Sequence, residues 1–372
     1  MATPTLERER ARKPVAHRSR RRWAWLVVLV ALAVVGALVT AWLVNDTDEP
    51  PGSLGRVDPE TFFGEGTHLA TSGGAIWAWG DRGQIGRYDD GTWQGYGGLP
   101  EGAGVLDVAV DADGRVLAST SIGVYRLEES GWRLHPAWSD VERYVTLEVD
   151  PVTGIEWWST SDGLFRWDGD ELTNVADPTG IDMLALGEIL ATGDGSLWAG
   201  GMYGYIPSAG GLARYHDDSS TWEVVRPLGG TNDVPADLLA STPDGGVWAM
   251  LADWSEDWED RQESGEPYVE WSLAHFDDRS QEWTVYRDGL PSGYPGAMAA
   301  DEDAVWLAQG GGSVADIELS EGLYRFDGHT WTTYLEGELV EDVAVAADGT
   351  VWVSLLDEPG VNQLTVDPEA GA

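Results

Sequence analysis

The chain has 372 residues, among them 48 Gly, 18 Pro and 21 Trp, and it contains no Cys. Its formal net charge is −42. A body this acidic repels polyanions, so we exclude nucleic acid as a partner. Without Cys no disulfide can form, and an exported domain must therefore be stabilised by burial alone.

The N-terminus predicts a membrane anchor. Residues 1–22 form a basic tail with eight Lys or Arg against two acids, and residues 23–44 follow without a charge. As a helix the second segment is about 33 Å long, enough to cross a hydrocarbon core of about 30 Å. Arg residues precede this segment, and Asp46, Asp48 and Glu49 follow it. The positive-inside rule then predicts a single-pass protein of the cell membrane, with a cytoplasmic N-terminus and an extracytoplasmic body.

A cleaved signal peptide is the alternative interpretation of the same segment. Val39 and Ala41 offer a small-residue cleavage site. The apolar run is, however, longer than the roughly 7–15 residues of a signal h-region, which favours the anchor. Both interpretations place the body outside the cell.

The body is built from an internal repeat. An acidic linker over residues 45–56 leads into a repeat domain over residues 57–367, followed by a tail over residues 368–372. Each repeat shows four short alternating segments separated by Asp/Gly turns, as antiparallel strands do. The second segment carries a large apolar anchor at intervals of 40 to 58 residues: Trp77, Leu117, Trp157, Trp198, Trp248, Trp306 and Trp352. This pattern predicts an all-β, seven-bladed β-propeller preceded by one N-terminal transmembrane α-helix.

Two further features of the repeat concern stability. An Arg recurs in the third segment, with His in its place once, and we expect it to stack on a ring or to pair with an acid. These positions are Arg87, Arg126, Arg166, Arg214, His275 and Arg325. The seventh repeat lacks its fourth segment, and an open edge invites aggregation. We expect residues 53–60 to supply the missing strand and to close the ring.

The repeat resembles that of two-component-regulator propellers. The resemblance rests on "DGLPSGYPGAMAADEDAVWLAQ", on "GLYRFDGHTWTTY" and on "GGLPEGAGVLDVAVDADGRVLASTSIGVYRL", and it covers residues 65–367. It implies a propeller of the kind that serves as a sensory ectodomain. A fainter resemblance to streptogramin-lyase-type propellers rests on "IWAWGDRGQIGRYDDG" in the first repeat, and it implies a metal-dependent site with a His and acids.

No motif in the chain predicts catalysis. Neither a nucleophile elbow nor a phosphate-binding loop is present, and the Asp/Gly turns lack the spacing of a calcium loop. We therefore predict no catalytic residue, no metal and no cofactor. The histidines of the body lie in different repeats without metal-ligand spacing; they are His68, His135, His216, His275 and His329.

Insertions mark the predicted binding face. Repeats four, five and six are lengthened between their second and third segments, at residues 201–210, 251–270 and 309–321. These loops emerge on one face of a propeller, and loops on a rigid scaffold are where ligands usually bind. Aromatic and acidic side chains of the inserts could hold a cationic group or stack on a sugar. The candidate ligand-binding residues are Trp254, Trp258, Tyr268, Tyr203, Tyr205, Asp257 and Glu259.

Three function hypotheses follow. The first is a non-catalytic, sensor-like module that binds an envelope protein, a cationic peptide or a glycan, with the lipid bilayer as a second partner through residues 23–44. The second is a lyase or hydrolase acting on an extracellular substrate in the central funnel. The third is an envelope assembly scaffold. Converging titratable groups with perturbed pKa values near the axis would favour the enzyme, and a broad apolar patch would favour the scaffold.

Overall fold

The structure is a computed structural model. It describes residues 52–56, 66–72, 74–80, 83–111, 114–140, 146–160, 163–175, 188–203, 206–229, 234–254, 269–291, 295–310, 321–358 and 360–366. The predicted anchor over residues 23–44 lies outside this part of the chain. None of the described residues belongs to a helix that is long and apolar enough to cross a bilayer.

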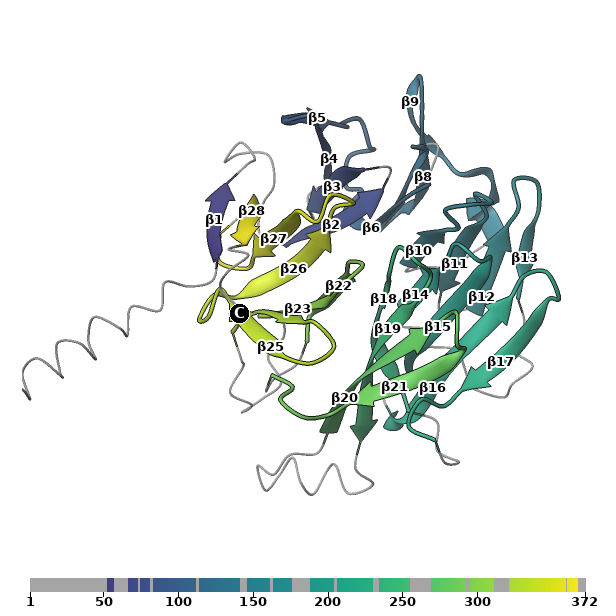
Figure 1. Cartoon of the computed structure of the whole chain (residues 1–372). Helices are drawn as coiled ribbons and strands as arrows, with labels where there is room; N and C mark the ends of the chain where they lie inside the picture. Colours follow the sequence, from purple (N-terminus) through teal and green to yellow (C-terminus); the bar gives the residue numbers. More distant parts are fainter. Residues whose placement is uncertain are drawn as a thin grey trace, which may run out of the picture. The chain divides into compact units, whose positions relative to one another are not determined.

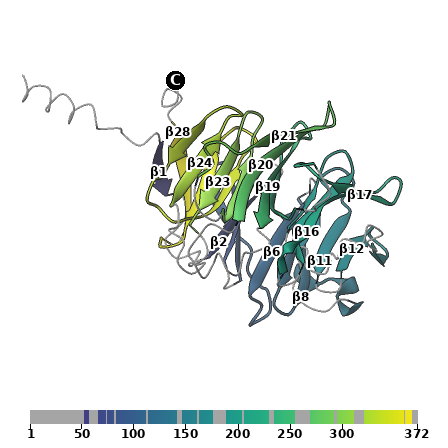
Figure 2. The same cartoon turned by 90° about the horizontal axis from the view of Figure 1, so that it is seen from below.

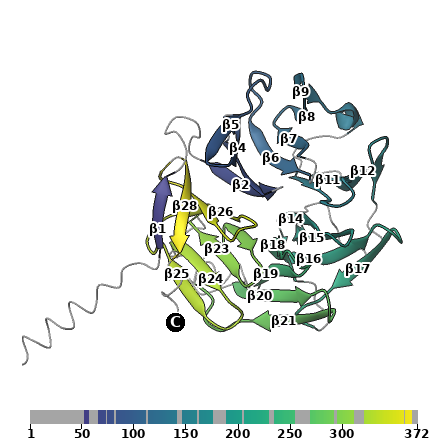
Figure 3. The ribbon, with the colours of Figure 1, turned by 45° about the horizontal axis from the view of Figure 1, so that its top comes forward.

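Seven four-stranded antiparallel sheets make up the described structure, and they confirm the predicted seven-bladed propeller. The first strand of every sheet contacts the first strand of the next sheet, and the seventh contacts the first, so the sheets form a closed ring. Figure 1 and Figure 3 show these inner strands around a common axis, with the later strands of each sheet farther out.

Each of the first four blades takes its strands from one continuous stretch of chain. Blade one holds β2 (Thr67–Ser72), β3 (Ala75–Gly80), β4 (Gln84–Asp89) and β5 (Thr92–Gly95). Blade two holds β6 (Val105–Val110), β7 (Val116–Thr120), β8 (Gly123–Glu128) and β9 (Gly131–Leu134), followed by the 3₁₀ helix η1 (Pro136–Asp140). Blade three holds β10 (Thr146–Val149), β11 (Glu156–Thr160), β12 (Gly163–Trp167) and β13 (Leu172–Asn174). Blade four holds β14 (Glu188–Ala191), β15 (Ser196–Tyr203), β16 (Ile206–His216) and β17 (Thr221–Val225).

Blades five and six repeat this order, and blade seven differs. Blade five holds β18 (Ala236–Ser241), β19 (Val247–Trp254), β20 (Val269–Asp277) and β21 (Glu282–Tyr286); its last three strands lie side by side in Figure 2. Blade six holds β22 (Ala297–Ala300), β23 (Val305–Gln309), β24 (Gly322–Phe326) and β25 (Trp331–Tyr334). Blade seven holds β26 (Val340–Val345), β27 (Val351–Leu355), β28 (Val361–Val366) and, from the other end of the domain, β1 (Gly52–Arg56).

The strand β1 closes the ring. It pairs antiparallel with β28, from Gly52 opposite Val366 to Arg56 opposite Asn362, and the two strands lie side by side in all three views (Figure 2). We expected a closing strand over residues 53–60. The structure has it at residues 52–56, and residues 57–60 lie outside the described part. A strand from the other end of the domain thereby occupies the outer edge of blade seven. This edge would otherwise be open to pairing with another chain.

The core lies between the blades rather than within them. Seven apolar clusters are present among the described residues, and each joins two neighbouring blades. The repeated second-strand anchors belong to these clusters. Trp77 packs with Val105 and Val116 of blade two, and Trp352 of blade seven packs with Leu69 of blade one. Because each sheet buries its faces against its neighbours, no blade is stable alone.

Candidate functional site

Carboxylates converge where the inner strands surround the axis. In each blade the inner-strand residue opposite the second-strand anchor serves as a reference, for example Ala109 opposite Leu117. Two residues before this reference position lie Asp107 in blade two, Glu188 in blade four and Asp342 in blade seven. Residues two apart on a strand share a face. The three acids therefore occupy equivalent places in three different blades.

A fourth acid and a histidine complete this cluster. Glu148 lies at the reference position of blade three, opposite Trp157. His68 lies two residues before the reference position of blade one, and its Nδ1 is 3.7 Å from Asp342 Oδ2. We call Asp107, Glu148, Glu188 and Asp342 the axial carboxylates.

Three of the axial carboxylates bind backbone N–H groups of the following blade. Asp107 Oδ2 accepts a hydrogen bond from Leu147 N at 2.7 Å. Glu148 Oε1 accepts one from Ala191 N at 3.4 Å. Asp342 Oδ2 accepts one from Leu69 N at 2.9 Å. These carboxylates are thus held in place by neighbouring inner strands.

Three of the axial carboxylates, Asp107, Glu148 and Glu188, have raised pKa values. All four residues are half-buried. Burial raises the pKa of Glu148 to about 8, and the charge of Asp107 adds to the shift. Burial likewise raises the pKa of Asp107 to about 6, against the hydrogen bonds from Leu147 and Val108. The pKa of Glu188 is raised well above its ordinary value by burial and by the charges of the other three. At neutral pH Glu148 is therefore mostly protonated, whereas Asp107 is mostly ionised.

The cluster lies near the face of the disc that carries the inserts. An inner strand begins at that face, where the connection from the preceding blade arrives, and second strands end there. Glu188 is the first residue of β14, and Asp107 and Asp342 are each the third residue of their strand. Within the described residues, no group of three or more His, Asp or Glu is arranged to hold a metal ion.

Two of the seven predicted ligand-binding residues lie in the described structure, and each ends a strand of a hairpin. Tyr203 ends β15 and is opposite Ile206, and Trp254 ends β19 and is opposite Val269. The inserts of blades four and five therefore begin as extensions of the second and third strands, not as loops. Both hairpins belong to neighbouring blades and open on the same face. The remaining candidates lie outside the described residues; they are Tyr205, Asp257, Trp258, Glu259 and Tyr268.

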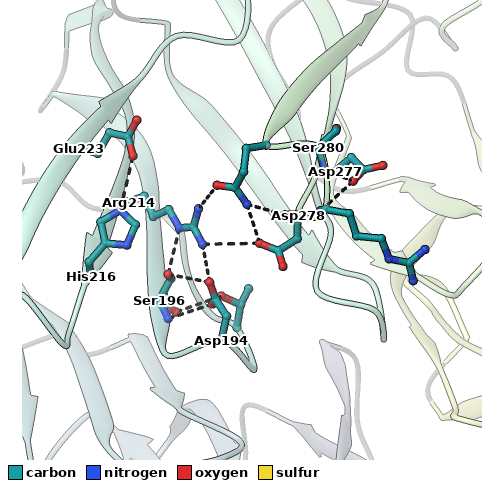
Figure 4. A network of polar contacts seen from close by, with 11 residues as sticks. Asp194, Ser196, Arg214, His216, Glu223, Asp277, Asp278 and Ser280 are labelled. Atoms are coloured by element: carbon teal, nitrogen blue, oxygen red, sulfur yellow. Dashed lines mark hydrogen bonds and ion pairs between the residues drawn. The ribbon is translucent and has the colours of Figure 1, made fainter.

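The repeated Arg positions link blades. Arg214 of blade four donates to Ser196 Oγ at 2.9 Å and to Asp194, and its Nη2 lies 3.8 Å from Asp278 Oδ1 of blade five (Figure 4). The guanidinium carbon is 5.0 Å from the ring centre of Trp198. Burial opposes the charge of Asp194, but hydrogen bonds from Thr192 and Ser196 and the charge of Arg214 prevail and lower its pKa. The network in Figure 4 thus joins blades four and five.

Equivalent contacts recur in other blades. Arg166 forms a bidentate pair with Asp217 of the next blade, at 2.7 and 3.0 Å. Arg126 donates to Glu156 of the next blade. Arg325 lies over the ring of Trp306, and His275 stacks on Trp248 with ring centres 4.3 Å apart. Burial lowers the pKa of His275. The contacts agree with a structural role for the repeated Arg.

The only fully buried histidine among the described residues lies at one of these seams. His135 follows β9, and its Nδ1 accepts a hydrogen bond from Ala137 N at 3.2 Å. Its Nε2 lies 3.0 Å from Arg126 Nη2 and 3.2 Å from Glu156 Oε2. The ring also meets Trp158 and Trp167 edge-on, with centres 4.7 and 4.9 Å away. These contacts place His135 in the interface between blades two and three.

Comparison with solved structures places the fold among known propellers. A streptogramin B lyase superimposes with a TM-score of 0.61 at 15% identity, over 85% of this chain and 98% of the other. The extracellular domain of the putative one-component system BT4673 from B. thetaiotaomicron gives 0.56 at 12% identity, over 83% of this chain and 39% of the other. YCF48 bound to D1 peptide gives 0.55 at 13% identity, over 86% and 96%.

The solved structures share the propeller fold. Both types of propeller named by the sequence resemblance are therefore found again by structure. At these identities the likeness concerns the fold alone. This chain spans well under half of the BT4673 domain. No family model and no curated protein sequence matches the chain.

The axial carboxylates were missed by sequence reasoning, although a signal existed. The inner strands of blades two and seven read VLDVAV and VEDVAV. Asp107 and Asp342 are the shared acids of this motif. An acid inside an otherwise apolar inner strand is unusual, because a buried charge is costly. Glu188 and Glu148 stand in strands without that motif, so only the register brings the four together.

Proposed function

We propose that the chain is a membrane-anchored, extracytoplasmic propeller that acts as a non-catalytic, sensor-like binding module. Its ligand is taken up on the face that carries the inserts of blades four to six. The observation that carries this proposal is the convergence of the axial carboxylates toward this face. Carboxylates gathered in one place attract cationic groups, so the partner presents an amine or a guanidinium.

The inserts supply the second element of the proposed site. The hairpins of blades four and five carry Tyr203 and Trp254 at their ends, and Trp258 and Tyr268 follow in the sequence. Aromatic faces near acids suit a cationic side chain, and they also suit a sugar. A cationic peptide on an envelope protein accounts for both the acids and the rings.

The proposed location rests on the uncharged stretch over residues 23–44 and its flanking charges. Among the propellers of similar fold is the extracellular domain of a putative one-component system, which supports a sensor-like role. Protease added to intact cells is expected to remove the body of the protein and to leave the N-terminal tail protected. Digestion of the body only after cell lysis would contradict the proposed extracytoplasmic location.

Binding is tested with the double variant Trp254→Ala and Trp258→Ala in the full-length chain in detergent. We expect a screen of cationic peptides and glycans to give ligands whose affinity falls about tenfold or more in this variant. The matched control is Val152→Ala, an exposed position 70% open to solvent in the turn between β10 and β11. Unchanged affinity for every ligand found would refute the insert face as the binding site.

A second candidate function is a propeller lyase or hydrolase. Two observations favour it: the perturbed pKa values of the axial carboxylates, and the place of His68 beside Asp342. A carboxyl such as Glu148 that stays protonated near neutral pH can serve as a general acid. The enzyme hypothesis predicts that the chain converts a streptogramin B to a product, seen by mass spectrometry, and that His68→Asn abolishes conversion. An unchanged substrate over prolonged incubation would exclude that substrate class.

A further inference from the structure

Three of the four large hydrophobic side chains that are exposed in the described structure lie on blade two. They are Leu106, Ile122 and Leu134, which are 39%, 45% and 52% exposed. The fourth, Val152, lies in a turn at the opposite face. Single exposed hydrophobic residues are commonplace, but a group on one edge marks an interaction site.

The three side chains follow one edge of the blade from the axis to the rim. Leu106 is the extra residue of a bulge in β6, opposite the end of β7. Ile122 is in the turn between β7 and β8, and Leu134 ends β9. A Cβ placed on Gly123 would lie 2.8 Å from Leu134 Cδ1, so Leu134 contacts the backbone next to Ile122. We call these three residues the blade-two ridge.

Other repeats carry polar residues at the same places. Blades five and seven have bulges that correspond to the one in blade two, and their extra residues are Asp237 and Glu341. The turn Thr-Ser-Ile-Gly of blade two reads Thr-Ser-Asp-Gly in blade three, where Asp162 replaces Ile122. The position of Leu134, opposite Tyr125, is held in blade three by Asn174, opposite Phe165. The fold therefore does not require apolar residues here.

Leu106, at the inner end of the ridge, directly precedes the axial carboxylate Asp107 in β6. Charge complementarity therefore selects a partner with a cation at one end of an apolar segment. The ridge crosses three inter-strand spacings of about 4.8 Å, or roughly 14 Å in all, which an extended peptide covers with about four or five residues. The net charge of −42 disfavours an anionic lipid surface as the alternative.

We propose that the blade-two ridge binds an extended peptide segment of a partner protein, with a Lys or Arg over the axial carboxylates and apolar side chains along the ridge. The inference rests on the proposed binding function and names the partner class. It assigns the contact to blade two, across the ring from the inserts of blades four to six. An experiment can therefore contradict the ridge proposal without contradicting the proposed binding function.

The test measures binding of a fluorescent peptide, Arg-Leu-Ser-Leu-Ser-Leu, to the full-length chain in detergent. The variant Ile122→Asn with Leu134→Asn removes two ridge side chains without changing the charge, and it uses a residue that blade three has at one of these places. We expect saturable binding to the wild type and about tenfold or more weaker binding to the variant. Replacing the Arg of the peptide with Gln should weaken binding by a similar factor. Val152→Asn is the matched control and should bind as the wild type does.

The outcomes separate the two proposals. Loss of peptide binding in the ridge variant, with binding kept in the variant Trp254→Ala with Trp258→Ala, supports the ridge. If binding is lost only in the variant Trp254→Ala with Trp258→Ala, the result contradicts the ridge proposal and supports binding at the insert face. The ridge is also overturned if the peptide does not bind the wild type, if zwitterionic vesicles are bound through Ile122 and Leu134 instead, or if these residues only mediate self-association in light scattering.

Discussion

Asp342 of the last blade accepts a hydrogen bond from the backbone N–H of Leu69 in the first blade, at 2.9 Å across a sequence separation of 273 residues. Two more bonds cross the same seam. Glu341 Oε2 accepts from Thr67 N at 3.1 Å, and Ser354 Oγ donates to Thr67 O at 2.5 Å. The seam that joins the last repeat to the first therefore combines these hydrogen bonds with the apolar cluster that includes Leu69, Ala344 and Trp352.

The first prediction concerns the apolar contacts of β1, the strand that closes the ring. Leu54 of β1 lies opposite Leu364 and packs against the cluster that joins blades six and seven. A carboxylate at this position would be unpaired in an apolar surrounding, so Leu54→Asp is expected to lower the free energy of unfolding by about 2–4 kcal/mol. Urea unfolding followed by Trp fluorescence measures the change. Val152→Asp, on the surface, should have no effect; equal losses in both would show that β1 does not close the ring.

The second prediction concerns pH. Glu148 has an ordinary pKa of 4.5 and a pKa of about 8 in the folded protein. Because the folded state binds the proton more tightly, stability is full below pH 4.5 and falls as the pH rises through 8. Glu148→Gln keeps an acceptor for Ala191 N but cannot ionise. The variant should therefore be more stable than the wild type above pH 8, by about 1–3 kcal/mol, and no more stable near pH 4.5.

Thermal unfolding across pH 4.5 to 9 checks this expectation. The control variant is Glu129→Gln at an exposed position, which should follow the wild type at every pH. A constant difference between Glu148→Gln and the wild type over the whole range would contradict a raised pKa for this carboxyl.

The third prediction concerns the seam between blades four and five. Arg214 is 6% exposed and touches Asp194, Ser196 and the ring of Trp198. Arg214→Met fills similar space but leaves the acids without their cation, so a loss of about 2–4 kcal/mol is expected. Arg279→Met breaks an exposed pair with Asp244, whose side chains are 81% and 48% open, and should change stability little. Similar losses in the two variants would argue against a structural role for the repeated Arg.

The sequence was sufficient for the ring but not for its centre. Each anchor recurs because it packs on the next blade, and each is opposite the repeated Arg or His in six blades, as with Trp198 and Arg214. Because every blade packs against its neighbour in the same way, a large apolar residue recurs at the same place in each repeat. The spacing of these residues along the chain predicts the blades. The axial carboxylates come from unequal strands, and their proximity depends on the register of four separate blades. No local pattern encodes that proximity.

The length of the insert hairpins also escaped sequence reasoning. Leu251 to Trp254 pair with Val269 to Ser272 and continue the ladder of β19 and β20, although the sequence of the insert is typical of a loop rich in acids and aromatics. Tertiary pairing overrides the low strand preference of Glu and Asp at Asp253 and Glu270, which are opposite one another. The candidates beyond Trp254 were chosen by composition, and they stay predictions.

The last prediction concerns the approach of two blades beside Glu188. Gly200 of β15 is opposite Glu188, and a Cβ there would lie 2.5 Å from the carbonyl oxygen of Ala236 and 2.8 Å from its Cβ. Ala236 begins the inner strand of blade five, so Gly200→Ala must push two blades apart next to the axial carboxylates. We expect a loss of about 1–3 kcal/mol in unfolding experiments, because overpacking in a rigid interior is costly. Gly97→Ala meets nothing within 4 Å and should be neutral or slightly stabilising. If the two variants unfold alike, the close approach of blade five to Gly200 is not a constraint on the ring.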